Sequence, residues 1–177
     1  MLLTEYFLSI VFIYFLLVFV GFRLVVPFMG FKQYSPPIGN LPQEIKQAVS
    51  DLEIKSHDQM SYLEAAYGLI MQKNFQQWKH SRFYAAVRPY RAFITDISEL
   101  WNTNEFIYCT SMNFLLYTLL ANSKFFKSSD VKLFYSFANM IIHQYMKIKV
   151  GDKWIDADPA GTGIKNKPLG THLAGFG

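Results

Sequence analysis

A two-residue turn at Gly151-Asp152 is the strongest structural signal in this chain of 177 residues. Glycine at the first central position is typical of the type II′ turn that closes a β-hairpin. Because side chains alternate between the two faces of a strand, such a turn fixes the pairing of every residue behind it. The predicted pairs are Val150 with Lys153, Ile148 with Ile155, Met146 with Ala157, and Lys147 with Asp156. Segments 140–150 and 154–157 are therefore expected to form an antiparallel hairpin with one apolar face.

A histidine and an aspartate come together on the other face of this predicted hairpin. His143 is the diagonal neighbour of Asp158, and diagonal residues lie roughly 7–8 Å apart, within reach of an imidazole and a carboxylate that lean together. Asp156 is nearer the turn and has Lys147 opposite it as an ion-pair partner. The register therefore predicts that Asp158, and not Asp156, contacts His143. His143 also lies on the more polar side of its strand, so we expect an accessible ring.

The segment that begins at Cys109 has the pattern of an amphipathic helix. Its apolar residues recur at helical spacing, at Met112, Leu115, Leu116, Leu119 and Leu120. Asn122-Ser123 ends this pattern, and a strand is expected over 131–135. Two further helices are expected before it, over 42–54 and from Ser56 onward. Helices packed on an antiparallel sheet place the chain in the α+β class.

Cys109, the only cysteine, stands where the free amide groups and dipole of a helix favour a thiolate. A thiol at a helix start, with an imidazole and a carboxylate on paired strands, provides a nucleophile, its base and the group that orients the base. Each residue alone also has an ordinary interpretation: a buried small hydrophobe, a strand histidine with a local hydrogen bond, and a turn-forming aspartate. Their order, spacing and register together favour the catalytic interpretation.

At this point the chain resembles the transglutaminase-like superfamily, which shares the papain-like architecture of cysteine proteases. The matching features are Cys109 at a helix start, the Leu-rich helix, Asn122-Ser123, the strand 131–135, His143-Gln-Tyr145 and Trp154-Ile-Asp-Ala-Asp158-Pro159. The resemblance runs closely from Cys109 to Gly161, and the helices before it fit only loosely. It implies a triad of Cys109, His143 and Asp158.

Two departures from the family pattern bear on the reaction. Cross-linking members of the family resemble Gly-Gln-Cys-Trp at the nucleophile, whereas this chain has Ile-Tyr-Cys109-Thr, and the usual His-x-Trp is His143-Gln-Tyr145 here. The resemblance therefore implies acyl transfer or hydrolysis at peptide or glutamine-type amides rather than a cross-linking specificity. An upstream amide usually completes the oxyanion hole in this family, and Asn104 and Asn102 are the candidates.

The N-terminus predicts a membrane anchor. The run from Tyr6 to Phe22 carries no charge, and Leu24-Val25-Val26 extends it, which matches the roughly 17–25 apolar residues of a spanning helix. A cleaved signal peptide is the rival, but it would need an early basic region, a shorter core and a small-residue cleavage site. The positive charges after the run favour a single-pass protein with its C-terminal domain in the cytoplasm.

The sequence thus divides into three expected parts: an anchor over 1–26, a Pro- and Gly-rich linker over 27–41, and a transglutaminase-like domain over 42–177. The net charge of +4 is scattered, so no nucleic-acid groove is expected. One cysteine, with no acids at ligand spacing from His57 or His80, predicts neither a metal nor another cofactor. His172, in the Gly-rich tail, is interpreted as a surface histidine. A peptide or protein substrate and the membrane are the expected partners.

Two other functions fit the same residues. One is a binding or structural module that keeps the fold without turnover, which a hidden Cys109 would favour. The other is a membrane-tethered scaffold whose many aromatic side chains bind a partner; the chain has 17 Phe, 11 Tyr and 3 Trp.

Overall fold

The structure, a computed structural model, describes residues 2–17, 21, 36–74, 89–103, 107–138, 141–161 and 168–175. These form the helices α1 (Leu2–Leu16), α3 (Gln43–Lys55), α4 (Gln59–Asn74), α6 (Ile97–Asn102) and α7 (Cys109–Ala121), the short 3-10 helices η4 (Pro89–Phe93) and η5 (Ser128–Asp130), and the strands β1 (Val131–Ala138), β2 (Ile141–Val150) and β3 (Lys153–Ala157). The fold is α+β, as predicted, with a three-stranded antiparallel sheet.

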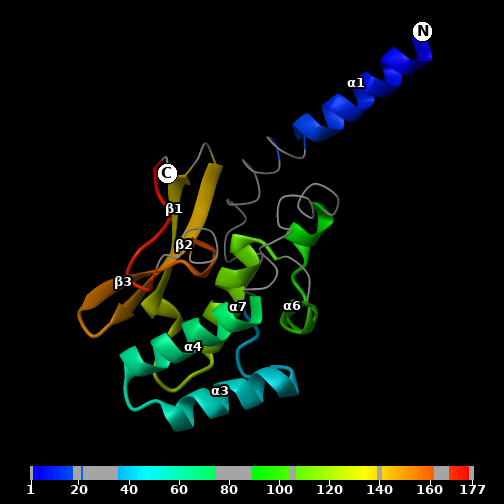
Figure 1. Cartoon of the computed structure of the whole chain (residues 1–177). Coiled ribbons are helices and arrows are strands. Elements are labelled where there is room, and N and C mark those ends of the chain that lie inside the picture. Colours follow the sequence, from blue (N-terminus) through cyan, green and yellow to red (C-terminus); the bar gives the residue numbers. More distant parts are fainter. Residues whose placement is uncertain are drawn as a thin grey trace.

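Helix α7 is the centre of the core. It packs against β2 and against α3, α4 and α6, so that the sheet and the helices enclose it (Figure 1). Every side chain from Thr110 to Leu120 is buried, whereas the sequence predicted a helix with one apolar stripe. Polar residues tolerate this burial when they bond locally, and the Thr118 hydroxyl donates to the Phe114 carbonyl at 2.8 Å.

Helices α3 and α4 cover one side of α7. α3 buries Ile45, Val49 and Leu52 at helical spacing, which confirms the predicted amphipathic pattern over 42–54. α4 begins where the Asp58 carboxylate accepts a hydrogen bond from the Ser61 amide at 2.7 Å, an N-terminal cap that satisfies one of the free amide groups there. The predicted aromatic loop region is described from residue 89 only, where η4 and α6 lie.

The sheet has the order β1-β2-β3 with the register predicted from the turn. Val150 pairs with Lys153, Ile148 with Ile155, Met146 with Ala157, and Lys147 with Asp156. Gly151 has a φ of +58°, a conformation that costs glycine nothing because it has no Cβ. The Gly151 amide also donates to the Gln59 side chain at 2.9 Å, which ties the hairpin tip to α4.

Helix α1 projects away from the other elements (Figure 1). Most of its side chains are apolar and exposed; Tyr6, Phe7, Ile10 and Phe12 are each more than 60 % exposed. Within the residues that the structure describes, no helix combines the length and apolarity needed to cross a membrane. The predicted continuous helix over 6–26 is therefore not supported, because α1 has 15 residues and residues 18–20 and 22–26 lie outside the described part.

Candidate active site

His143 and Asp158 form a buried pair at the end of the sheet. The His143 Nε2 atom lies 2.9 Å from Asp158 Oδ1 and 2.8 Å from Oδ2. His143 comes from β2, and Asp158 follows β3 directly, so the hairpin register brings them together. The predicted contact is confirmed: Asp158 holds His143, and Asp156 has other partners.

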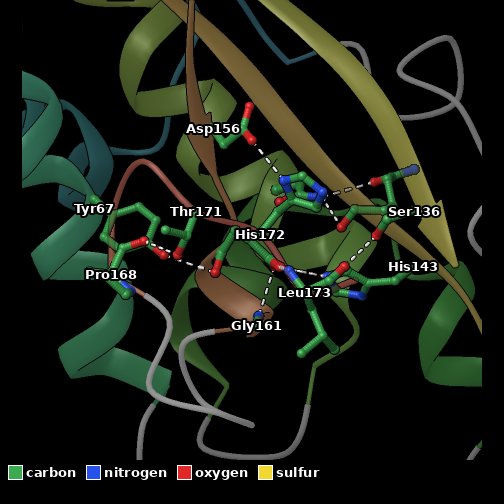
Figure 2. A network of polar contacts seen from close by, with 12 residues as sticks. Tyr67, Ser136, His143, Asp156, Gly161, Pro168, Thr171, His172 and Leu173 are labelled. Atoms are coloured by element: carbon green, nitrogen blue, oxygen red, sulfur yellow. Dashed lines mark hydrogen bonds and ion pairs between the residues drawn. The ribbon is translucent and has the colours of Figure 1, made fainter. Parts of the chain in front are cut away.

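Three more groups fix the position of Asp158. Its Oδ1 accepts from the Gly161 amide at 2.7 Å, and its Oδ2 accepts from the Leu173 amide at 2.9 Å. Its carbonyl accepts from the buried Tyr67 hydroxyl at 2.8 Å. The carboxylate is fully buried, and a buried charge is tolerated only when such hydrogen bonds replace its water. Figure 2 shows His143, Gly161 and Leu173 around this point.

Cys109 stands at the first position of α7, as predicted. Its side chain is close enough to the His143 ring to hydrogen-bond with it. Because Asp158 occupies Nε2, the Nδ1 atom is the nitrogen left to face the thiol. Cys109 is a free cysteine of intermediate exposure, and it packs against the edge of the hydrophobic core. The first amides of α7 have no partner inside the helix.

The charge state of His143 follows from its two neighbours. Burial opposes the charged imidazolium, but the hydrogen bonds to Asp158 and Cys109 and their negative charges outweigh it and raise the pKa of His143 to about 10. At neutral pH the ring is therefore protonated.

The C-terminal tail, residues 168–175, covers this pair. The Ser136 hydroxyl donates to the Leu173 carbonyl at 2.5 Å, and the Gly175 amide donates to the Phe137 carbonyl at 2.8 Å. The tail thus lies against the end of β1 and across Asp158. His143 is only 7 % exposed as a result, so the prediction of an accessible histidine is wrong: the polar side of its strand faces the tail and not solvent.

A second histidine–aspartate pair lies beside the first. His172 Nδ1 is 2.7 Å from Asp156 Oδ2, and the His172 ring stacks on Tyr145 with centroids 4.1 Å apart. Lys147 Nζ lies 3.5 Å from Asp156 Oδ1, which confirms the predicted ion pair. His172 is therefore half-buried and not the surface histidine that was predicted, because the tail places it on the sheet (Figure 2).

The structure gives different information on Asn104 and Asn102, the two residues expected to complete the oxyanion hole. Asn104 lies outside the described residues. Asn102 ends α6 with an exposed side chain, and in the part of the chain that the structure describes no hydrogen bond joins it to Cys109 or His143. The sequence reasoning missed Asn113 and Gln144, which are buried and bonded to each other. One sign of them lies in the sequence: each is a polar amide among the apolar residues of a predicted buried face, Asn113 on the helix and Gln144 on the strand.

No group of three metal-binding side chains occurs among the described residues. Comparisons with models of protein families, with curated proteins and with solved structures found no match.

Proposed function

We propose that this protein is a cysteine enzyme of transglutaminase-like type, with Cys109 as nucleophile, His143 as acid and base, and Asp158 as the group that orients the imidazole. The observation that carries the proposal is the single ring of His143, which contacts a fully buried carboxylate on one side and the thiol at a helix start on the other. This is the geometry that activates a cysteine nucleophile. The match to the family motif from Cys109 to Gly161 supports the same conclusion.

The proposed reaction is acyl transfer from an amide of a peptide or protein. The Cys109 sulfur bonds to the carbonyl carbon, and the electron pair of the C=O bond moves to oxygen. As it returns, the C–N bond breaks, and the His143 imidazolium gives its proton to the departing amine. A thioester remains on Cys109. Water or a second amine then attacks the thioester while His143 accepts the proton, which gives hydrolysis or transfer.

Several features of the site suit this chemistry. The two oxygens of Asp158 both face Nε2, which fixes the tautomer and the ring orientation. Cys109 is the first residue of α7, and the amide of a nucleophile at a helix start suits a developing oxyanion. Asp158 is fully buried, whereas Cys109 as a residue is only partly buried.

One observation favours an inactive module with the same fold. The tail covers His143 and Asp158, and such a cover also suits a site that never admits a substrate. A fluorescent iodoacetamide probe decides between the two, since the chain has one cysteine. We expect rapid labelling at neutral pH, no labelling of Cys109→Ser, and turnover of some member of a panel of amide and peptide substrates. An unreactive Cys109 would favour the inactive module.

The proposal includes attachment to a membrane through the N-terminal helix. The exposed apolar side chains of α1 support it, and so does the uncharged sequence that continues to Phe22. Apolar side chains on all sides of a helix suit lipid better than a single protein partner, which would cover one face.

A further inference from the structure

The face of the sheet that points away from α7 carries three neighbouring lysines. Lys147 pairs with Lys132 on β1 and with Asp156 on β3, and Lys149 follows on the same side of β2. The alternate residues of β2, such as Ile148, belong to the core, so the lysines face outward. Like charges directly opposite each other destabilise a strand pair. The sheet itself therefore gains nothing from pairing Lys132 with Lys147.

One carboxylate serves this face, and it is already shared. Asp156 Oδ1 lies 3.5 Å from Lys147 Nζ, and Asp156 Oδ2 lies 2.7 Å from His172 Nδ1. In the part of the chain that the structure describes, neither Lys132 nor Lys149 forms an ion pair. The face therefore keeps two uncompensated positive charges, which a partner of negative charge would complement.

Two aromatic rings lie among these lysines. Lys132 Nζ is 4.5 Å from the centre of the Trp154 ring, and Lys147 Nζ is 5.1 Å from that of Phe134. Such contacts hold an ammonium group by a ring without neutralising its charge. Trp154 and Phe134 are each 38 % exposed. The face thus joins positive charge to exposed aromatic surface, a combination that suits the boundary between lipid and water.

The C-terminal tail leaves this part of the sheet open. It covers the same face only toward its other end, where the His172 ring stacks on Tyr145 with centroids 4.1 Å apart. Lys149 and Trp154 pair with each other next to the Gly151 turn, away from that contact. We call the open part, made of Lys132, Lys147, Lys149, Phe134 and Trp154, the basic face.

The small size of this charge excess selects the kind of partner. Each lysine near an anionic lipid surface strengthens binding by about fivefold. Three lysines together give on the order of 10²-fold, too little to hold a partner from dilute solution. A surface that is already held close needs no more, because binding to it is intramolecular in effect. The proposed attachment through α1 provides such a surface, and the positive charges after the apolar run favour the side of the membrane whose lipids are anionic.

We propose that the basic face docks the domain onto an anionic lipid surface, with its ammonium groups among the lipid headgroups and its two aromatic rings at the same depth. The inference rests on the attachment through α1, which is part of the proposed function. It adds a fixed orientation of the domain at the membrane. The sheet lies against the lipid, and α3 and α4, on the other side of α7, are directed away from it (Figure 1).

The fluorescence of Trp154 reports this docking, because bromine on lipid chains quenches a tryptophan only on contact. The full-length protein is bound to vesicles of brominated phosphatidylcholine with or without about one third phosphatidylserine, and the signal of Trp154→Phe is subtracted. Lys132→Glu combined with Lys149→Glu reverses charges on the basic face. Lys46→Glu combined with Lys55→Glu is the matched control, because it makes the same change of net charge at exposed positions of α3.

We expect quenching of Trp154 in vesicles that contain phosphatidylserine, and less quenching at high salt, which screens surface charge. The loss of two lysines should lower the docking equilibrium constant by at least about 25-fold, fivefold for each, while the control variant docks as wild type. Flotation of each protein with both kinds of vesicle checks that α1 is attached, and thermal unfolding checks that each variant is folded.

Equal quenching with and without phosphatidylserine would overturn the inference, and so would docking of Lys132→Glu with Lys149→Glu at the wild-type level. Salt-sensitive binding of soluble poly-glutamate to the same lysines, without any response to phosphatidylserine, would assign the basic face to an acidic protein instead. A wild type that floats with neither kind of vesicle would refute the attachment through α1, and the inference with it.

Discussion

At the scale of single residues, Gly161 and Asp158 show how tightly the buried acid is enclosed. A Cβ atom on Gly161 would lie 2.1 Å from Asp158 Oδ2 and 2.6 Å from its Cγ. The carboxylate has no room to retreat, because His143 and the Leu173 amide hold it from other sides. Position 161 thus requires glycine because a side chain would not fit beside Asp158, and not because of its backbone conformation.

Gly161→Ala should therefore destabilise the protein by about 1–3 kcal/mol, the usual cost of overpacking, and displace Asp158 from His143. Urea denaturation measures the first effect and alkylation of Cys109 the second. Gly68→Ala is the control, because nothing lies within 4 Å of its added Cβ; in the interior of α4 it should be neutral or stabilising. A variant at Gly161 as stable and reactive as wild type would contradict the described contact.

The free energy of unfolding should depend on pH through the protonation of His143 in its pair with Asp158. The pKa of His143 is raised to about 10 in the folded protein, against about 6.5 for an unfolded histidine. Between these values the folded state holds a proton that the unfolded state lacks. This contribution to the free energy of unfolding is complete below about pH 6.5 and is lost as the pH rises toward 10.

We expect urea denaturation between pH 6 and pH 9.5 to show this fall. The Cys109→Ser background removes the titration of the thiol from the comparison. Adding Asp158→Asn should flatten the dependence, because a neutral amide does not favour the imidazolium. Equal slopes with and without Asp158 would show that another group titrates.

At the scale of elements, the tail over 168–175 is a strap: it lies across the site and holds the Asp158 carboxylate toward His143. It is held by the Gly170 amide on the Asp156 carbonyl and the Gly175 amide on the Phe137 carbonyl, each at 2.8 Å. Between these anchors, the Leu173 amide reaches the Asp158 carboxylate. The strap thus connects both edges of the sheet to the site.

Leu173→Pro tests this link, because proline has no amide hydrogen to donate. Leu173→Ala is the matched control, since it loses the buried side chain but keeps the donor. We expect the proline variant to be less stable than the alanine variant by about 1.5–3 kcal/mol, the worth of a hydrogen bond to a charged group, and to react more slowly with iodoacetamide. Variants of equal stability and reactivity would show that the strap only covers the site.

The hairpin and the strap differ in how far the sequence predicts them. The Gly151-Asp152 turn and the alternating strands are local signals, and they predicted every pair of the hairpin and the His143–Asp158 contact. The strap has no periodic pattern, so neither its course nor the half-burial of His172 could be read from it. The Gln144–Asn113 bond joins a strand to a helix 31 positions away, and such contacts depend on how the elements pack.

At the scale of the whole molecule, the chain combines an enclosed core with an exposed apolar helix. In the described residues, α7 buries nearly all of its side chains, while α1 buries almost none. Exposed apolar surface on this scale indicates a membrane or a partner that covers it. Attachment to a membrane would place the thiol of Cys109 near substrates that are themselves bound there.

Flotation of the full-length protein with phospholipid vesicles tests the attachment. Phe12→Lys puts a charge on α1, and such a charge costs roughly 2.5–3.5 kcal/mol at the centre of a bilayer, which lowers the partition coefficient by about 10²-fold. Ile54→Lys is the matched control, because Ile54 is an exposed apolar residue on α3, at 80 % exposure against 68 % for Phe12. We expect wild type and Ile54→Lys to float with the vesicles and Phe12→Lys to remain largely below them. Equal flotation of all three would show that α1 does not enter the lipid, and a wild type that stays soluble and monomeric without vesicles would refute the attachment altogether.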